Sequence, residues 1–242
     1  MFKDDGSHRR RRTPYLEDRV ELDRVTSPRS WDYEQFRKVL SLLGALGNGL
    51  SIPASNSPES IHVDGWRKVV NELQNSTSKD GNEHGVALFA EHYKQDIFFS
   101  DQITTLGLPG KTDLEYVYQT PQKHPMSRII GSIHTHPGII GNGLSATDYE
   151  IFLHSKEQQV MSILNKGKII LSMKTLDTPS QSDLGPDLGK ELESKFQGFL
   201  GSGGGDNSQI VFDFNKQVCA QFGLTLYAGD SNRLLLKQVR LI

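Results

Sequence analysis

Two short apolar segments, residues 86–90 and 168–174, limit the folds open to this chain more than any other feature of the sequence. Each has the length of a strand and lacks the regular polar alternation of a strand with one solvated face, so a buried strand is favoured. Segments with the apolar spacing of amphipathic helices occur at residues 31–46, 149–164, 188–200 and 210–222. The sequence therefore predicts an α/β fold in which helices pack on both sides of a mixed sheet.

The remaining predicted elements are shorter. Further strands are expected at residues 96–99, 114–118 and 128–136, and a C-terminal hairpin at residues 224–227 and 234–236. Asp64 can cap a helix that carries Trp66 and Leu73 on one side, and the polar stretch 75–81 is expected to end that helix.

Three parts of the chain differ in composition. Residues 1–30 are dense in charge of both signs, and we predict a mobile, disordered N-terminal tail. Residues 31–60 are predicted to form a helix and a proline-containing linker. Residues 61–242 are predicted to form the main domain, including the C-terminal helices and the hairpin.

Composition limits the partners and the cellular location that are expected for the chain. The net charge of −2 gives the chain no overall positive field that would attract nucleic acid. Only the basic run Arg9–Arg12 could bind an acidic partner or serve as a nuclear import signal. The single cysteine, Cys219, excludes an intrachain disulfide and fits a reducing compartment. No apolar run has the length of a membrane span, so no membrane association and a cytoplasmic location are expected.

One motif combines residue types that could bind a metal ion. His134 and His136 are expected on one strand, where residues i and i+2 share a face with Cα atoms roughly 6.5 to 7 Å apart. Ser145 and Asp148 follow at a predicted helix start, and a carboxylate in the first helical turn can supply a third metal ligand. Three protein ligands leave a tetrahedral Zn²⁺ with one open position, which is typical of a catalytic site.

Each part of this motif also has an ordinary explanation. Two histidines can lie on the exposed face of a strand, Pro137 can end that strand, and Ser145 with Asp148 can form a capping box. The joint pattern, including the fixed spacing, is expected by chance on the order of once in ten thousand chains of this length. The combination therefore favours a metal site, and capping and metal ligation are compatible.

The segment resembles the signature of the JAMM (MPN-plus) zinc metalloproteases and isopeptidases, in which an upstream glutamate precedes H-[ST]-H-P-x(7)-S-x-x-D. Gly131 and the loop residues Gly138, Gly141 and Leu144 match members of that family that act on ubiquitin chains. Upstream, Glu83 leads into the apolar strand as the family's glutamate does, with Ala90 in place of a final glycine. A competing register through Asn82 and Gly85, and a second acidic residue, Glu91, remain open.

The resemblance spans about residues 61–175 and implies an MPN-like (cytidine-deaminase-like) fold. It implies Zn²⁺ held by His134, His136 and Asp148, Glu83 as the general base and acid, and Ser145 as a hydrogen-bond donor to the oxyanion. The implied reaction is hydrolysis of a peptide or isopeptide bond at the C-terminus of ubiquitin or a ubiquitin-like protein. Residues 107–125 and 177–206 correspond to substrate-binding insertions, and an activating partner subunit is left open.

Other functions are compatible with the same residues. The chain could be a prokaryotic peptidase that trims sulfur-carrier or other small proteins, or a zinc-bound but inactive MPN scaffold or binding module. A nucleic-acid-associated relative would draw only on the basic run Arg9–Arg12.

Overall fold

The structure of the chain is a computed structural model that describes residues 22, 26, 28–46, 51–91, 96–105, 127–137, 143–202 and 207–241. The predicted tail with Arg9–Arg12, the strand predicted at 114–118 and the loop residues Gly138 and Gly141 lie outside these ranges.

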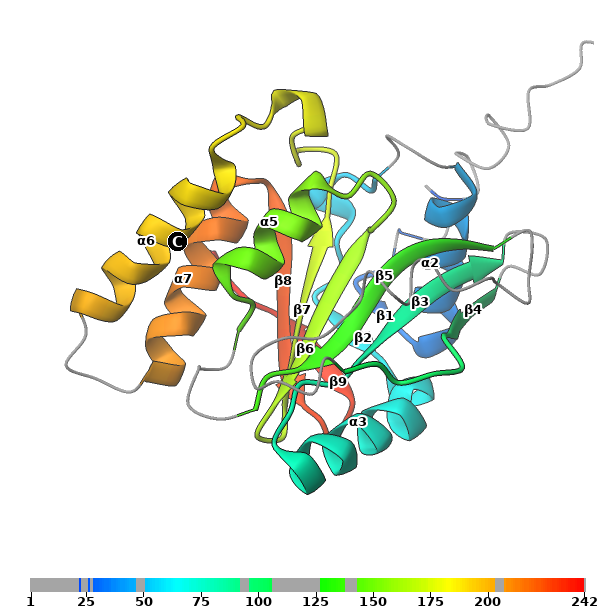
Figure 1. The fold of residues 1–242 in the computed structure, drawn as a ribbon. Coiled ribbons are helices and arrows are strands. Elements are labelled where there is room, and N and C mark those ends of the chain that lie inside the picture. Colours follow the sequence, from blue (N-terminus) through cyan, green and yellow to red (C-terminus); the bar gives the residue numbers. More distant parts are fainter. Residues whose placement is uncertain are drawn as a thin grey trace, which may run out of the picture.

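One mixed sheet organises the described residues (Figure 1). Its strands are β1 (Ser30–Trp31), β2 (Ser60–His62), β3 (Gly85–Glu91), β4 (Asp96–Phe99), β5 (Ser127–Thr135), β6 (Val160–Asn165), β7 (Lys168–Lys174), β8 (Leu224–Asp230) and β9 (Leu235–Gln238). Their order across the sheet is β1-β2-β9-β8-β7-β6-β5-β3-β4. The pairs β1–β2 and β5–β6 are parallel and the other neighbours are antiparallel, which confirms the mixed α/β class.

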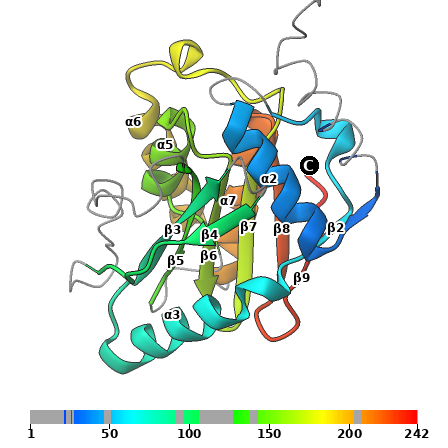
Figure 2. The same ribbon diagram turned by 90° about the vertical axis from the view of Figure 1, so that its right-hand side faces the viewer.

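Helices cover both faces of this sheet (Figures 1 and 2). The helices are α2 (Tyr33–Leu46), α3 (Arg67–Asp80), α5 (Ala146–His154), α6 (Leu188–Ser202) and α7 (Asn207–Gln221). One core cluster joins α2 and α3 to one face of the sheet, and a second cluster joins α5, α6 and α7 to the other face. Trp31 and Phe36 belong to the first cluster, so the segment that precedes residue 61 shares its core with the sheet.

The predicted helix over residues 149–164 is wrong in its second half. Helix α5 ends at His154, and residues 160–165 form β6, all six of them buried. Met161 and Ile163 face the cluster under α5–α7, whereas Val160 and Leu164 face the cluster under α2. A strand buried on both faces has no polar alternation, and its apolar residues therefore continued the helical spacing of the preceding segment.

The helix that begins after Trp66 also differs from the prediction. The polar stretch 75–81 ends it only at its last residue, because α3 runs to Asp80 with the polar side chains largely toward solvent. Gly81 ends the helix with φ of 74°, the left-handed conformation that glycine adopts most easily.

The other predicted elements are confirmed with small shifts of their ends. They are the helices at 31–46, 188–200 and 210–222, the strands at 86–90, 96–99, 128–136 and 168–174, and the C-terminal hairpin. Short 3₁₀ turns add η1 (Ala54–Asn56), η2 (Asp64–Trp66) and η4 (Gln181–Asp183).

Candidate metal centre

Strand β5 carries the two histidines into the interior. His134 lies near the end of the strand and His136 directly after it, and they are 1% and 7% exposed. The backbone N–H of His136 donates to the Leu164 carbonyl near the end of β6. This hydrogen bond fixes the position of His136, although it lies outside β5. Gly131 lets β5 approach β6 closely, because a Cβ there would lie 2.4 Å from the Val160 carbonyl oxygen.

The start of α5 supplies the carboxylate. Ser145 is the N-cap, and its hydroxyl accepts from the Asp148 N–H at 3.2 Å. The Asp148 carboxylate in turn accepts from the backbone N–H and from the hydroxyl of Ser145, each at 2.7 Å. This capping box fixes the Asp148 side chain without help from a metal ion.

These elements bring three predicted ligands together. The Nε2 atoms of His134 and His136 lie 3.0 Å apart, and the Asp148 carboxylate oxygens lie 3.2 Å from the first and 3.3 Å from the second. One ligand atom from each residue lies within 4.8 Å of the others. The cluster of His134, His136 and Asp148 could therefore hold a metal ion.

The charges of the cluster are strongly coupled. Burial alone would raise the pKa of Asp148, but the neighbouring His134 and His136 hold that pKa well below its usual range. Burial opposes protonation of His136, yet the hydrogen bond and charge of Asp148 raise the pKa of the imidazole. The backbone of Gly143 also raises the pKa of the His136 imidazole, although Nδ1 of His136 has no hydrogen-bond partner of good geometry.

The donor set fits a cation. Two imidazole nitrogens and a carboxylate face one another at hydrogen-bond distance, and all three offer lone pairs once the histidines are neutral. Without a cation or shared protons between them, these lone pairs would repel one another inside the protein.

Glu83 reaches the same cluster from the segment just before β3. Its Oε1 lies 3.6 Å from Nε2 of His136, and the residue is 6% exposed. Burial raises the pKa of the Glu83 carboxyl, an effect that the charges of His136 and His134 partly offset. Glu91 pairs with Ser127 at the far end of β3, away from His134, so the structure brings Glu83 and not Glu91 to the candidate ligands.

Two contacts place the segment that carries Glu83. The Thr135 hydroxyl accepts from the His84 N–H at 2.9 Å and donates to the His84 carbonyl at 3.3 Å. The His84 ring contacts both carboxylate oxygens of Asp80 at 3.0 Å, at the end of α3. The threonine inside the His-Thr-His motif thus holds the backbone of His84, next to Glu83, while His134 and His136 face the cluster.

Sequence reasoning missed Asn215 in α7, which is 0% exposed. Its amide nitrogen donates to the carbonyls of Leu144 and Val211, and its Oδ1 accepts from the Leu144 N–H and the Tyr149 hydroxyl. Asn215 therefore anchors the residue directly before Ser145. A polar residue among the buried apolar positions of α7 was the available signal.

No known protein family, curated protein or solved structure gives a significant match to this chain. Among the helices of the described ranges, none has the length and apolar character needed to cross a membrane.

Proposed function

We propose that the protein is a zinc-dependent hydrolase that cleaves a peptide or isopeptide bond at the C-terminus of ubiquitin or a ubiquitin-like protein. The observation that carries this proposal is the convergence of His134, His136 and Asp148, with the Glu83 carboxylate 3.6 Å from His136. An acid–base group beside a three-residue metal cluster is the arrangement that metal-assisted hydrolysis requires. The resemblance of the motif to JAMM proteases supports the same reaction and an MPN-like fold.

His134, His136 and Asp148 would hold the zinc ion, because two imidazoles and a carboxylate are a ligand set of catalytic zinc sites. When bound, zinc would supply a Lewis acid that polarises the scissile carbonyl and makes a water molecule more acidic.

Glu83 would accept the proton of the attacking water and then pass it to the leaving amine, which departs poorly without a proton. Thr135 supports this role by holding the adjacent His84 backbone against β5. Ser145 donates its hydroxyl proton to Asp148 in this structure, so it would have to turn that proton toward the substrate to stabilise an oxyanion.

The substrate class rests on the resemblance. JAMM enzymes accept an extended C-terminal peptide, and the loop residues that follow His136 match members that act on ubiquitin chains. A requirement for a partner subunit would appear as zinc binding without hydrolysis by the isolated chain.

Metal content tests the ligand assignment. We expect near one zinc per wild-type chain by atomic emission and little zinc in His134→Ala, because two remaining ligands bind zinc weakly. His62→Ala is the matched control, since His62 is exposed on β2, and it should keep the full zinc content. Equal zinc in wild type and His134→Ala would contradict the assignment.

A cleavage assay tests the proposed hydrolase reaction. A ubiquitin-fold protein with a C-terminal extension and a lysine-linked conjugate are offered to the zinc-loaded chain, with and without a chelator. We expect chelator-sensitive cleavage that falls at least about 100-fold in Glu83→Gln, while zinc content is retained. Cleavage that is unchanged in Glu83→Gln would refute its role as the base.

A further inference from the structure

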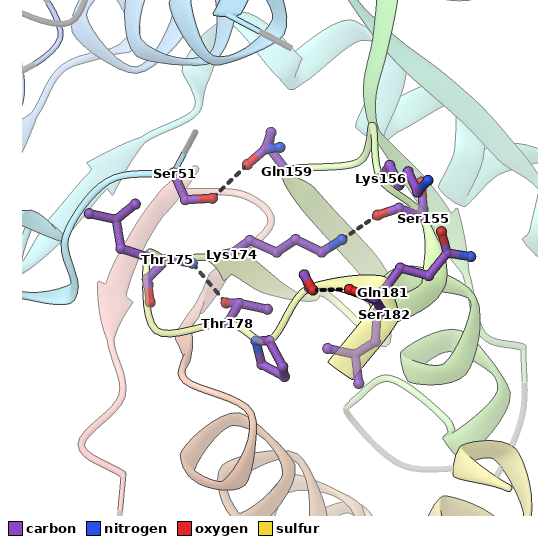
Figure 3. A pocket seen from close by; sticks show the side chains of 13 residues that line it. Ser51, Ser155, Lys156, Gln159, Lys174, Thr175, Thr178, Gln181 and Ser182 are labelled. Atoms are coloured by element: carbon purple, nitrogen blue, oxygen red, sulfur yellow. Dashed lines mark hydrogen bonds between the residues drawn. The ribbon is translucent and has the colours of Figure 1, made fainter. Parts of the chain in front are cut away.

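A second site lies at the other end of α5, away from the metal ligands (Figure 3). It is a pocket of about 620 Å³, a size typical of small-molecule sites. Its walls come from Ser51, from the end of α5 and the residues after it up to Gln159, and from residues between Lys174, the last of β7, and Ser182. Asp148 lies in the first turn of α5, whereas Ser155 caps its last turn, so the helix separates the two sites.

The register of the sheet also places the pocket and the metal ligands at opposite ends of the strands. His136 bonds to Leu164 at the carboxyl end of β6. Lys174 ends the antiparallel neighbour β7, where the backbone N–H of Lys174 donates to Gln159 ahead of β6. The predicted specificity segment 177–206 therefore begins at the end of the sheet opposite to the metal ligands.

Lys174 brings a buried cation to the pocket wall. The residue is 7% exposed, and its Nζ donates to the Ser155 carbonyl at 2.5 Å and lies 4.9 Å from the centre of the Phe152 ring. Within the described residues no carboxylate forms an ion pair with Lys174. An ammonium group has three N–H donors, and the Ser155 carbonyl uses one of them. The charge is therefore left without an anionic partner.

The neighbouring polar groups also offer donors. The Gln159 side-chain carbonyl already accepts from Ser51, which leaves its amide nitrogen for another partner. The Ser155 hydroxyl accepts from the Gln158 N–H, which leaves its own proton to donate. Lys156 adds a second cation at the rim, and none of the lining residues is acidic. A negatively charged group with several hydrogen-bond acceptors would pair with these donors and with the two lysines.

We propose that this pocket binds the oxyanion of a small molecule, a phosphate or a carboxylate, with Lys174 as the central cation and Ser155 and Gln159 as hydrogen-bond donors. The bond to Ser155 and the Phe152 ring hold the Lys174 side chain in place before the ligand arrives, which reduces the entropy lost on binding. This site is independent of the proposed hydrolase activity.

The test is an NMR titration of the full chain with inorganic phosphate in one arm and acetate in the other. We expect saturable shifts of the amides of residues 155–159 and 174–182 with at least one probe, and the responding probe identifies the oxyanion. Lys174→Met, which keeps most of the apolar stem and removes the charge, should weaken that binding at least tenfold. Lys168→Met removes an exposed lysine at the other end of β7 and should change the affinity less than twofold.

Ser155→Ala provides a second variant should Lys174→Met fail to fold. It removes one hydroxyl donor and leaves the carbonyl that Lys174 contacts, so we expect binding to weaken at least threefold. The proposal is overturned by the absence of saturable shifts with both probes, by unchanged affinity in both pocket variants, or by shifts confined to the surroundings of His134.

Discussion

At the scale of single residues, Lys174 shows what burial does to a charge. Burial lowers its pKa from 10.5 to about 8, because the surrounding protein solvates an ammonium less well than water does. A shift of that size corresponds to about 3 kcal/mol of lost folding stability while the lysine is charged. The Ser155 carbonyl and the Phe152 ring are the groups that contact the ammonium.

The pH dependence of stability follows from this shift. Below pH 8 both the folded and unfolded chains carry the proton, and the cost of burial is fully present. Between pH 8 and 10.5 the folded chain releases its proton first, so its stability should rise by up to about 1.4 kcal/mol per pH unit. Relative to Lys174→Met, the wild type should therefore gain about 2–3 kcal/mol in urea unfolding between pH 7.5 and 10.5.

Lys168→Met is the control for that series, because Lys168 is an exposed lysine at the other end of β7. The stability difference between wild type and this control should stay constant over the same pH range. If the difference between wild type and Lys174→Met were equally constant, Lys174 would not be buried as a charged group.

At the scale of elements, the start of α5 depends on α7. Asn215 bonds to both backbone groups of Leu144 and to the Tyr149 hydroxyl, and these residues flank Ser145 and Asp148. Gly143 fits against the Asn215 amide, where a Cβ would lie 2.5 Å from its Nδ2. Asp148, the candidate metal ligand on α5, is thus positioned by a helix that contributes no residue to the cluster.

Asn215→Ala should uncouple these two helices. It leaves the buried Leu144 N–H and carbonyl without partners, which should cost about 2–4 kcal/mol of unfolding free energy. Zinc affinity should fall about 10-fold or more, as when groups that orient a ligand are removed. Asn71→Ala, at an exposed position of α3, should change neither chemical denaturation nor competitive zinc titration. Unchanged zinc affinity in Asn215→Ala would refute the coupling.

The elements also show which features the sequence could predict. The positions of His134, His136 and Asp148 could be predicted because strand and helix periodicity place side chains within one continuous segment. The contact between Thr135 and His84 and the anchor at Asn215 could not, because they depend on how distant segments pack. The helix predicted through residue 164 failed for a related reason, since β6 is apolar on both faces only because helices cover both faces of the sheet.

At the scale of the whole molecule, the two large core clusters of the described residues lie on opposite faces of the sheet. Trp31, Phe36 and Leu40 are each 0% exposed and pack in the core under α2 together with sheet residues. Strand β1 pairs with β2, and Ile52 forms a bridge with Thr175 after β7. The segment before residue 61 therefore covers one face of the sheet.

A chain that begins at Ile61 should not fold cooperatively. Exposure of the surface that contacts Trp31, Phe36 and Leu40 should cost several kcal/mol per residue, which together approaches the whole stability of a typical domain. A chain that begins at Leu22 keeps this layer and should melt as the full chain does when followed by circular dichroism. A sharp melting transition of residues 61–242 alone would show that they form an autonomous domain.

The origin of the ligands has a consequence for the order of assembly. The histidines and the aspartate belong to a strand and the beginning of the helix that follows it, whereas Glu83 is held by a pairing of His84 and Thr135, which are 51 residues apart. Contacts that close small loops lose less chain entropy and form sooner during refolding. By the proposed function, an incompletely folded chain would bind metal before it could hydrolyse a substrate, and hydrolysis would begin only once the pairing of His84 with Thr135 had formed.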